Sequence, residues 1–218
     1  MMRRAISCLS YLVVLSALSA TATAAGKTYT TKFQRTENPI SEGGVWTNIG
    51  LDWTPVVTSD GIAYGTHHNT GYNDSYAALS GFAPDQSAEG MIYITGSFTA
   101  NQEIELLLRW TQSAYVARGY EINWNANNSY AYIVRWNGAL GDFTLLHRLS
   151  FPRPPATGDV LKAWIIGSLI SVYLNGKLIG FFSDSTWATG NPGIGFYSED
   201  ATGSQNPRYG FTSFSATE

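Results

Sequence analysis

The strongest local constraint on the fold is a tight turn within residues 170–179. Asn175-Gly176 separates two short runs in which apolar residues alternate with other side chains. Asn and Gly tolerate the positive φ angles that both central residues of a type I′ turn require, and this turn joins neighbouring antiparallel strands. We therefore expect a two-stranded hairpin whose strands contribute to a buried core.

The same pattern recurs through the rest of the chain. Short runs of β-branched and aromatic residues are separated by Gly, Asn, Asp and Pro, and none has the 3.6-residue period of a helix. Only 13% of the residues are charged, which argues against long solvated helices and disorder. No linker or repeat interrupts the pattern, so we expect one domain. The expected strands are residues 91–98, 103–110, 120–125, 130–136, 143–149, 160–166, 169–174 and 177–182.

The first residues read as an export signal. Arg3 and Arg4 precede an apolar run at residues 9–20 and a small-residue tract at 20–25, as in a Sec-type signal peptide. The residues after the two arginines fit a twin-arginine signal poorly. We expect residues 1–24 to be removed and residues 25–218 to form a secreted domain, extracellular or periplasmic. The only cysteine, Cys8, leaves with the signal, so the domain folds without disulfides.

The charge balance narrows the range of partners. The formal net charge is -3 at pH 7, with no basic stripe that could neutralise phosphates. No segment after the signal is long and apolar enough to span a bilayer. We expect a monomer that binds neither nucleic acid nor the membrane interior.

Strand alternation separates two faces in the middle of the chain. Glu103 and Glu105 lie two residues apart, so both should project from the same face of their strand. If strands 103–110, 120–125 and 130–136 are neighbours, their polar positions form one patch with both charge signs. The expected patch consists of Glu105, Arg109, Glu121, Asn123 and Arg135.

The C-terminal part of the chain carries a recognisable order of elements. It combines a strand at 159–164, Gly167, the Asn-Gly hairpin, residues 190–196 with a Gly-Ile-Gly motif, and a closing strand at 211–214. This order resembles the concanavalin A-like lectin/glucanase superfamily and its laminin-G-like jelly rolls. The resemblance implies an all-β fold, a two-sheet antiparallel β-sandwich. It does not specify an activity, since the superfamily includes sugar-binding modules, glycoside hydrolases, polysaccharide lyases and adhesion modules.

Two glutamates supply the clearest enzymatic signal. Carboxyl groups at i and i+2 of a strand have about the separation, roughly 5–5.5 Å, that a retaining glycosidase needs. If the protein is an enzyme, the candidate catalytic residues are this pair, Glu103 and Glu105, together with Glu121 of the expected polar patch. The glucanases of the resembled superfamily carry an acidic-x-Asp-x-Glu pattern, whereas this chain has no such Asp and has Leu107 at the third position. A merely solvated strand face is the alternative.

The aromatic content offers a second route to a function. The chain has 7 Trp and 13 Tyr, and aromatic rings stack on the apolar faces of pyranose sugars. Four tryptophans occupy alternating positions expected to face the core: Trp110, Trp124, Trp136 and Trp164. The other three lie near turn signals and are expected at a ligand-binding rim: Trp46, Trp53 and Trp187.

The sequence predicts no metal-ligating residues and no cofactor. Without cysteine, and with 3 histidines of which two are adjacent, a zinc cage is not expected. A structural calcium ion stays open, because aspartates in expected loops could hold one.

These observations favour a secreted, lectin-like domain that binds a polysaccharide or glycan on one sheet face. The alternative is a polysaccharide-degrading enzyme, hydrolase or lyase, that uses the same face. A third option is a structural or adhesion module of a cell surface.

Overall fold

The computed structural model describes residues 26–48, 53–67, 74–98, 100–200 and 202–218. The expected signal segment, residues 1–24, lies outside the described residues and stays a prediction. Within the described ranges, no helix has the length and apolar character required to cross a membrane.

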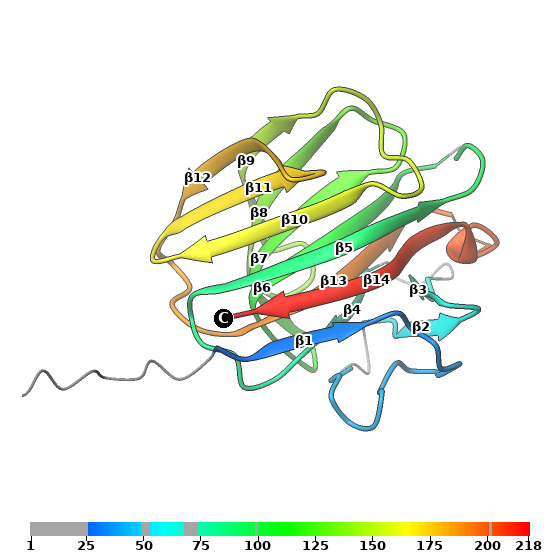
Figure 1. The fold of residues 1–218 in the computed structure, drawn as a ribbon, viewed down its shortest axis with the longest axis horizontal. Helices are drawn as coiled ribbons and strands as arrows, with labels where there is room; N and C mark the ends of the chain where they lie inside the picture. Colours follow the sequence, from blue (N-terminus) through cyan, green and yellow to red (C-terminus); the bar gives the residue numbers. More distant parts are fainter. Residues whose placement is uncertain (1–25, 49–52, 68–73, 99, 201) are drawn as a thin grey trace, which may run out of the picture.

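The chain folds into two antiparallel sheets stacked face to face, as Figure 1 shows. The first sheet has eight strands. Seven follow one path, and β1 (Thr28–Thr31) pairs with β14 beside it. The order along the path is β12 (Lys177–Ser183), β11 (Leu169–Leu174), β10 (Val160–Ile166), β5 (Gln86–Ile94), β14 (Tyr209–Thr217), β3 (Ile62–Gly65) and β2 (Val56–Ser59).

The second sheet has six strands and carries the candidate site. A short 3₁₀ helix, η1 (Asn206–Arg208), precedes β14. The expected all-β, two-sheet antiparallel sandwich is therefore confirmed. The strand order is β4 (Asp74–Ala78), β13 (Asn191–Ser198), β6 (Gln102–Ser113), β7 (Val116–Asn125), β8 (Tyr130–Gly138) and β9 (Phe143–Ser150).

Every strand expected between residues 91 and 182 coincides with an observed strand. The main departure is β5, which begins at Gln86 and ends at Ile94, so residues 95–98 lie outside it. The Asn-Gly turn is also confirmed: Asn175 and Gly176 have φ angles of 50° and 78°, and Leu174 pairs with Lys177.

The main core lies between the sheets and follows from alternation. In β6, Ile104, Leu106 and Leu108 are buried against inward-facing residues of the eight-stranded sheet. Trp46 belongs to this core, with its ring 5.2 Å from that of Phe214, so its expected place at a binding rim is wrong. A long-range contact that local turn signals do not reveal explains the error.

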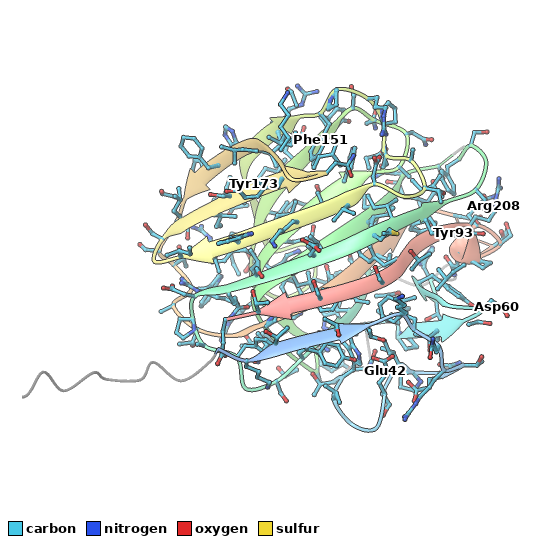
Figure 2. All side chains as sticks on the ribbon, viewed as in Figure 1. Glu42, Asp60, Tyr93, Phe151, Tyr173 and Arg208 are labelled. Atoms are coloured by element: carbon cyan, nitrogen blue, oxygen red, sulfur yellow. The ribbon has the colours of Figure 1, made fainter. Side chains whose placement is uncertain are left out.

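The outward face of the eight-stranded sheet is partly apolar. Trp164, expected in the core, is exposed on β10. Its ring lies 6.3 Å from that of Tyr173 on β11, the residue labelled in Figure 2. The register explains this: Ala163 and Ile165 face inward, so Trp164 between them must face outward.

Candidate functional site

A pocket of about 410 Å³ lies on the face of the six-stranded sheet that points away from the main core. This volume is within the range of small-ligand sites in proteins. All six strands, or the loops next to them, contribute to it. The lining residues are Asp74, Asn101, Glu103, Glu121, Asn123, Tyr132, Val134, Trp136, Leu140, Gly141, Phe143, Leu145 and Tyr197.

Three glutamates converge at the floor of this pocket, and two of them, Glu103 and Glu121, line it. The β6–β7 register places Asn123 opposite Glu105 and Glu121 opposite Leu107, so Glu121 is a diagonal neighbour of Glu105 on the same face. One carboxylate oxygen from each of Glu103, Glu105 and Glu121 lies within 4.8 Å of the others. The structure thus brings together the three glutamates that sequence analysis named as candidate catalytic residues.

Two of the glutamates are anchored by hydrogen bonds. Trp136 Nε1 donates to Glu121 Oε2 at 2.7 Å, and the Tyr76 hydroxyl donates to the same oxygen at 3.2 Å. Asn123 Nδ2 donates to Glu103 Oε2 at 3.0 Å. These contacts hold the carboxyl groups of Glu103 and Glu121 at fixed positions on the pocket floor.

Glu105 differs from its two neighbours. Its exposed fraction is 0%, and neither of its carboxylate oxygens has a hydrogen-bond partner among the described residues. It is absent from the pocket lining, although it lies two residues from Glu103 on the same face of β6. A buried carboxyl group without a partner is costly and requires a reason.

Burial and mutual repulsion change the acidity of this cluster. Burial raises the pKa of Glu103 to about 7, and the charge of Glu199 adds to the effect. Burial raises the pKa of Asp74 to about 7 as well, helped by the charge of Glu103. The pKa values of Glu105 and Glu121 are raised by burial and by the neighbouring carboxylates. At neutral pH the floor therefore holds protons and can both donate and accept hydrogen bonds.

Aromatic side chains support one side of the pocket. Trp136 lines it and is buried, while Phe143, with 47% exposure, packs 5.4 Å from Trp136 at the open edge. Trp53 lies behind them, 5.6 Å from Trp136 and 5.3 Å from Tyr76. Trp53 is buried, so its expected position at an exposed rim is wrong. It supports the aromatic wall from behind.

Arg109 does not share the face of the glutamates. The β6–β7 register shifts between Leu108 and Thr111, and Arg109 has a φ of 46°, which turns its side chain away from the glutamate face. The buried guanidinium donates to the carbonyl oxygens of Pro84, Trp187 and Gly167 at 2.7–2.9 Å. Its expected membership of the polar patch is wrong, and its contacts are those of a structural residue.

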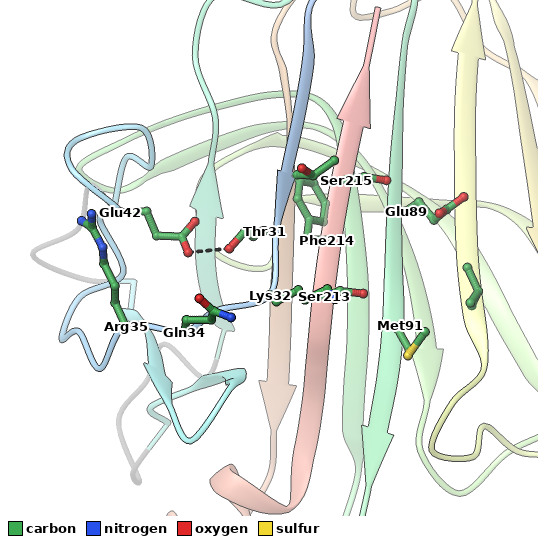
Figure 3. Close-up of a pocket in the computed structure, with 12 residues that line it drawn as sticks. Thr31, Lys32, Gln34, Arg35, Glu42, Glu89, Met91, Ser213, Phe214 and Ser215 are labelled. Carbon is green, nitrogen blue, oxygen red and sulfur yellow. Dashed lines mark hydrogen bonds between the residues drawn. The ribbon is translucent and has the colours of Figure 1, made fainter.

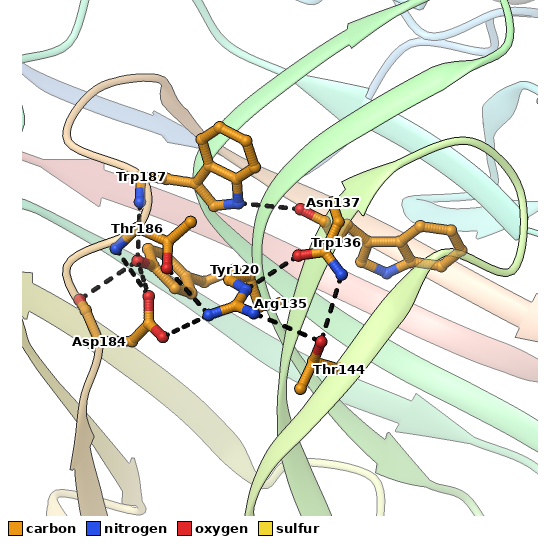
Figure 4. A network of polar contacts seen from close by, with 8 residues as sticks. All are labelled: Tyr120, Arg135, Trp136, Asn137, Thr144, Asp184, Thr186 and Trp187. Carbon is orange, nitrogen blue, oxygen red and sulfur yellow. Dashed lines mark hydrogen bonds and ion pairs between the residues drawn. The ribbon is translucent and has the colours of Figure 1, made fainter.

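Arg135 is also displaced from the expected patch, and Figure 4 shows the polar network that it joins with Asp184 and Thr144. The β7–β8 register pairs Arg135 with Tyr120, whereas Glu121 is paired with Val134, so the guanidinium faces away from the glutamates. Arg135 forms an ion pair with Asp184 at 2.7 Å, and the Tyr120 hydroxyl donates to the same carboxylate at 2.7 Å.

Trp187 belongs to the network of Figure 4 and does not line the pocket. Its backbone N–H donates to the Tyr120 hydroxyl at 3.0 Å, and its indole N–H donates to the Trp136 carbonyl at 2.9 Å. Of the three tryptophans expected at a rim, Trp187 is the only partly exposed one. Its indole is tied to the strand that carries Trp136.

Sequence reasoning missed several pocket residues. Asp74 and Tyr197 come from β4 and β13; β13 pairs with β6 and β4 pairs with β13, and the local pattern indicated neither pairing. Phe143 was expected only as part of a strand. One available signal was Gly195, because a glycine inside a strand marks the close approach of another group.

A second pocket, of about 610 Å³, lies beside the outward face of the eight-stranded sheet (Figure 3). It combines Lys32 and Arg35 with Glu42 and Glu89, and Thr31 donates to Glu42 at 2.5 Å. Among the described residues that line it, the one aromatic residue, Phe214, is buried. The pocket on the six-stranded sheet is therefore the better candidate, since it combines a fixed polar floor with an accessible aromatic wall.

Comparisons with known proteins identify solved structures with a similar fold. No family model matches the chain, and no curated protein matches its sequence. Among solved structures, carbohydrate-binding module CBM66 from Bacillus subtilis is similar, with a TM-score of 0.57 and 17% identity over 80% of this chain and 92% of that one. The Emp46p carbohydrate recognition domain has a TM-score of 0.56 and 11% identity, with coverages of 85% and 94%.

An enzyme shows the same architecture. An endo-β-galactosidase from Clostridium perfringens, which releases GlcNAcα1-4Gal, has a TM-score of 0.56 and 11% identity over 90% of this chain and 64% of that one. These similarities confirm the concanavalin A-like jelly-roll fold for this chain. At such low identities they establish the fold alone.

Proposed function

We propose that this protein is an exported carbohydrate-binding domain that holds a neutral glycan in the pocket on the six-stranded sheet. One observation carries the proposal: Glu103, Glu121 and Asn123 form a fixed polar floor beside the accessible ring of Phe143. This combination suits sugars, because they present hydroxyl groups around the ring edge and apolar C–H groups on the ring faces.

The charge of the pocket favours a neutral sugar. Among the described residues that line it are three carboxylic acids and no lysine or arginine. Arg109 and Arg135, which could have neutralised a uronate or sulfate group, are held elsewhere by hydrogen bonds. An acidic glycan would find no cation among these residues to pair with its charge, which opposes binding. The same reasoning argues against a uronate lyase, which needs a cation at the substrate carboxylate.

The comparisons and the N-terminal sequence support this proposal. CBM66 and the Emp46p domain are named as carbohydrate-binding proteins, and both share the fold over most of their length. The pattern of residues 1–24 supports export, and an exported protein meets polysaccharides and cell-surface glycans.

Glycoside hydrolysis is the second candidate function. The observation in its favour is that oxygens of Glu103, Glu105 and Glu121 lie within 4.8 Å of one another, close to the carboxyl separation of retaining glycosidases, roughly 5–5.5 Å. A hydrolase would use one glutamate as nucleophile and another as acid. The raised pKa of each group favours the acid role and opposes the nucleophilic one.

A glycan array and a reducing-sugar assay on the same panel separate the two functions. The binding proposal predicts retention of one or more neutral glycans without release of reducing ends. Release that stops in Glu103→Gln, while retention persists, would establish the hydrolase instead. Absence of retention and release across neutral glycans, with the folded protein verified by circular dichroism, would overturn both.

A further inference from the structure

Glu105 is a buried carboxyl group that nothing among the described residues compensates. It lies on a central strand with 0% exposure, and neither carboxylate oxygen has a partner within hydrogen-bond distance among the described residues. An ionised carboxylate in this position lacks a compensating charge, and a protonated one lacks an acceptor for its O–H. Either form alone leaves a buried polar group unsatisfied.

The chain keeps space free for this carboxylate. Gly195 on β13 lies directly opposite Glu105, and a Cβ at Gly195 would lie 2.2 Å from Glu105 Oε2. Any other residue at position 195 would displace the carboxylate. The absent side chain is thus matched to a carboxyl group that has an oxygen within 4.8 Å of an oxygen of each of the other two glutamates.

We propose that Glu103, Glu105 and Glu121 form a binding site for a single calcium ion at the floor of the pocket. Calcium takes oxygen ligands at about 2.3–2.6 Å, so two ligands on opposite sides of one ion are separated by roughly 4.6–5.2 Å. The three glutamate oxygens lie within 4.8 Å of one another, inside the span that one ion can bridge. Glu105 then gains the partner that the protein itself does not provide.

The surrounding contacts leave the required oxygens available. Trp136 and Tyr76 both donate to Oε2 of Glu121, which leaves its Oε1 free of these two donors. Asn101 and Asn123 each donate to one oxygen of Glu103, and a carboxylate oxygen has a second lone pair for a cation. The anchoring hydrogen bonds would orient the ligands as the outer contacts of metal sites do.

The ion has a route to the site and room for further ligands. Asp74, Glu103 and Glu121 line the open pocket, so hydrated calcium can enter from solvent. Water molecules in the pocket would complete the six to eight ligands that calcium prefers. This site is distinct from the loop aspartates that left calcium open in the sequence, and it replaces the expectation of no metal ligands. The proposal does not rest on glycan binding.

Terbium luminescence provides a direct test, since Tb³⁺ replaces calcium at oxygen sites. The indole of Trp136 donates to Glu121, so excitation of tryptophan should sensitise bound Tb³⁺. The EDTA-treated wild-type protein should give a saturable Tb³⁺ signal that CaCl2 displaces. Calcium should also raise the Tm, because it binds the folded state and not the unfolded one.

Glu105→Gln is the decisive variant, because Glu105 does not line the sugar pocket. It should weaken Tb³⁺ and Ca²⁺ binding by about tenfold or more, since one of three anionic ligands is lost. In EDTA the variant should be about as stable as wild type, because a buried amide without partners replaces a buried carboxyl group without partners and of similar size. Glu89→Gln, on β5 of the other sheet, is the matched control and should bind like wild type.

Three results would overturn the proposal. They are a wild-type protein that shows no saturable Tb³⁺ or Ca²⁺ binding, a Glu105→Gln variant that binds like wild type, and a Glu89→Gln variant that loses binding equally. If Glu105→Gln fails to fold, Glu103→Gln replaces it, with the same loss of affinity expected. A failure of calcium binding leaves the glycan array result unaffected, so the two proposals are tested separately.

Discussion

Gly195 on β13 lies opposite Glu105 on β6, and a Cβ at this glycine would lie 2.2 Å from Glu105 Oε2 and 2.8 Å from the Tyr76 ring. Because both neighbours are buried in a packed layer, neither can move without disturbing the pocket floor. The glycine therefore determines where the carboxylate of Glu105 lies.

Gly195→Ala should destabilise the fold by about 1–3 kcal/mol, the usual cost of overpacking. Urea denaturation measures the change in the free energy of unfolding. Gly138→Ala, on β8, is the matched control, since its Cβ would meet nothing nearer than Asp142 Oδ2 at 3.7 Å. Equal stability of the two variants would contradict the packing described for Gly195. Adding Glu105→Ala to Gly195→Ala should recover part of the loss.

Arg109→Ala should destabilise the protein strongly. The guanidinium donates to three backbone carbonyls, and hydrogen bonds to charged groups contribute about 1.5–3 kcal/mol each, so we expect a loss of about 3 kcal/mol or more. Arg118→Ala, which removes an exposed arginine on β7, should change the free energy of unfolding by less than about 1 kcal/mol. A stable Arg109→Ala variant with impaired glycan retention would contradict the structural role and show that Arg109 takes part in glycan binding.

Asp184 should contribute to the loss of stability in acid. Burial alone would raise its pKa, but hydrogen bonds from Tyr120 and Thr186 and the charge of Arg135 outweigh burial and lower the pKa. A lowered carboxyl pKa stabilises the fold above the unfolded-state pKa, about 4, and this contribution disappears as the pH falls through the folded-state pKa. Between pH 6 and strongly acidic pH, Asp184→Asn should therefore lose less stability than wild type. An equal loss of unfolding free energy with falling pH in wild type and Asp184→Asn would refute this role.

The Asn-Gly turn should tolerate little change. Gly176 has a φ of 78°, so Gly176→Val would place a β-branched residue in a left-handed conformation. Strain of this kind costs on the order of 1–3 kcal/mol. The expected result is a lower urea midpoint with an unchanged m-value. Wild-type stability would show that residues 169–183 do not depend on this turn geometry.

Much of the fold was predictable because local patterns determine it. Alternation placed Ile104, Leu106 and Leu108 in the core, and Asn175-Gly176 fixed a hairpin without information from elsewhere in the chain. The same rule put Glu103 and Glu105 on one face, because residues two apart in a strand always share a face.

The rest of the site depends on relationships that no local pattern contains. Arg109 does not lie on the glutamate face, because the register shift between Leu108 and Thr111 reverses the direction in which the side chains after Leu108 point. The alternation expected around Arg135 is present, but only the register shows that Tyr120 and not Glu121 lies opposite. Trp53 was misplaced because it packs against β4 and β8, which are distant in sequence.

The central claim is that a neutral glycan binds the pocket on the six-stranded sheet, and two exposed phenylalanines test it most directly. Phe143 lines that pocket, while Phe181, with 60% exposure, lies on β12 of the other sheet. Isothermal titration calorimetry with a neutral oligosaccharide from the array should show weaker binding by Phe143→Ala, by about 0.5–1.5 kcal/mol, the contribution of one aromatic contact. Phe181→Ala should bind like wild type. Unchanged affinity in Phe143→Ala together with a loss in Phe181→Ala would place the glycan on the opposite sheet and contradict the account.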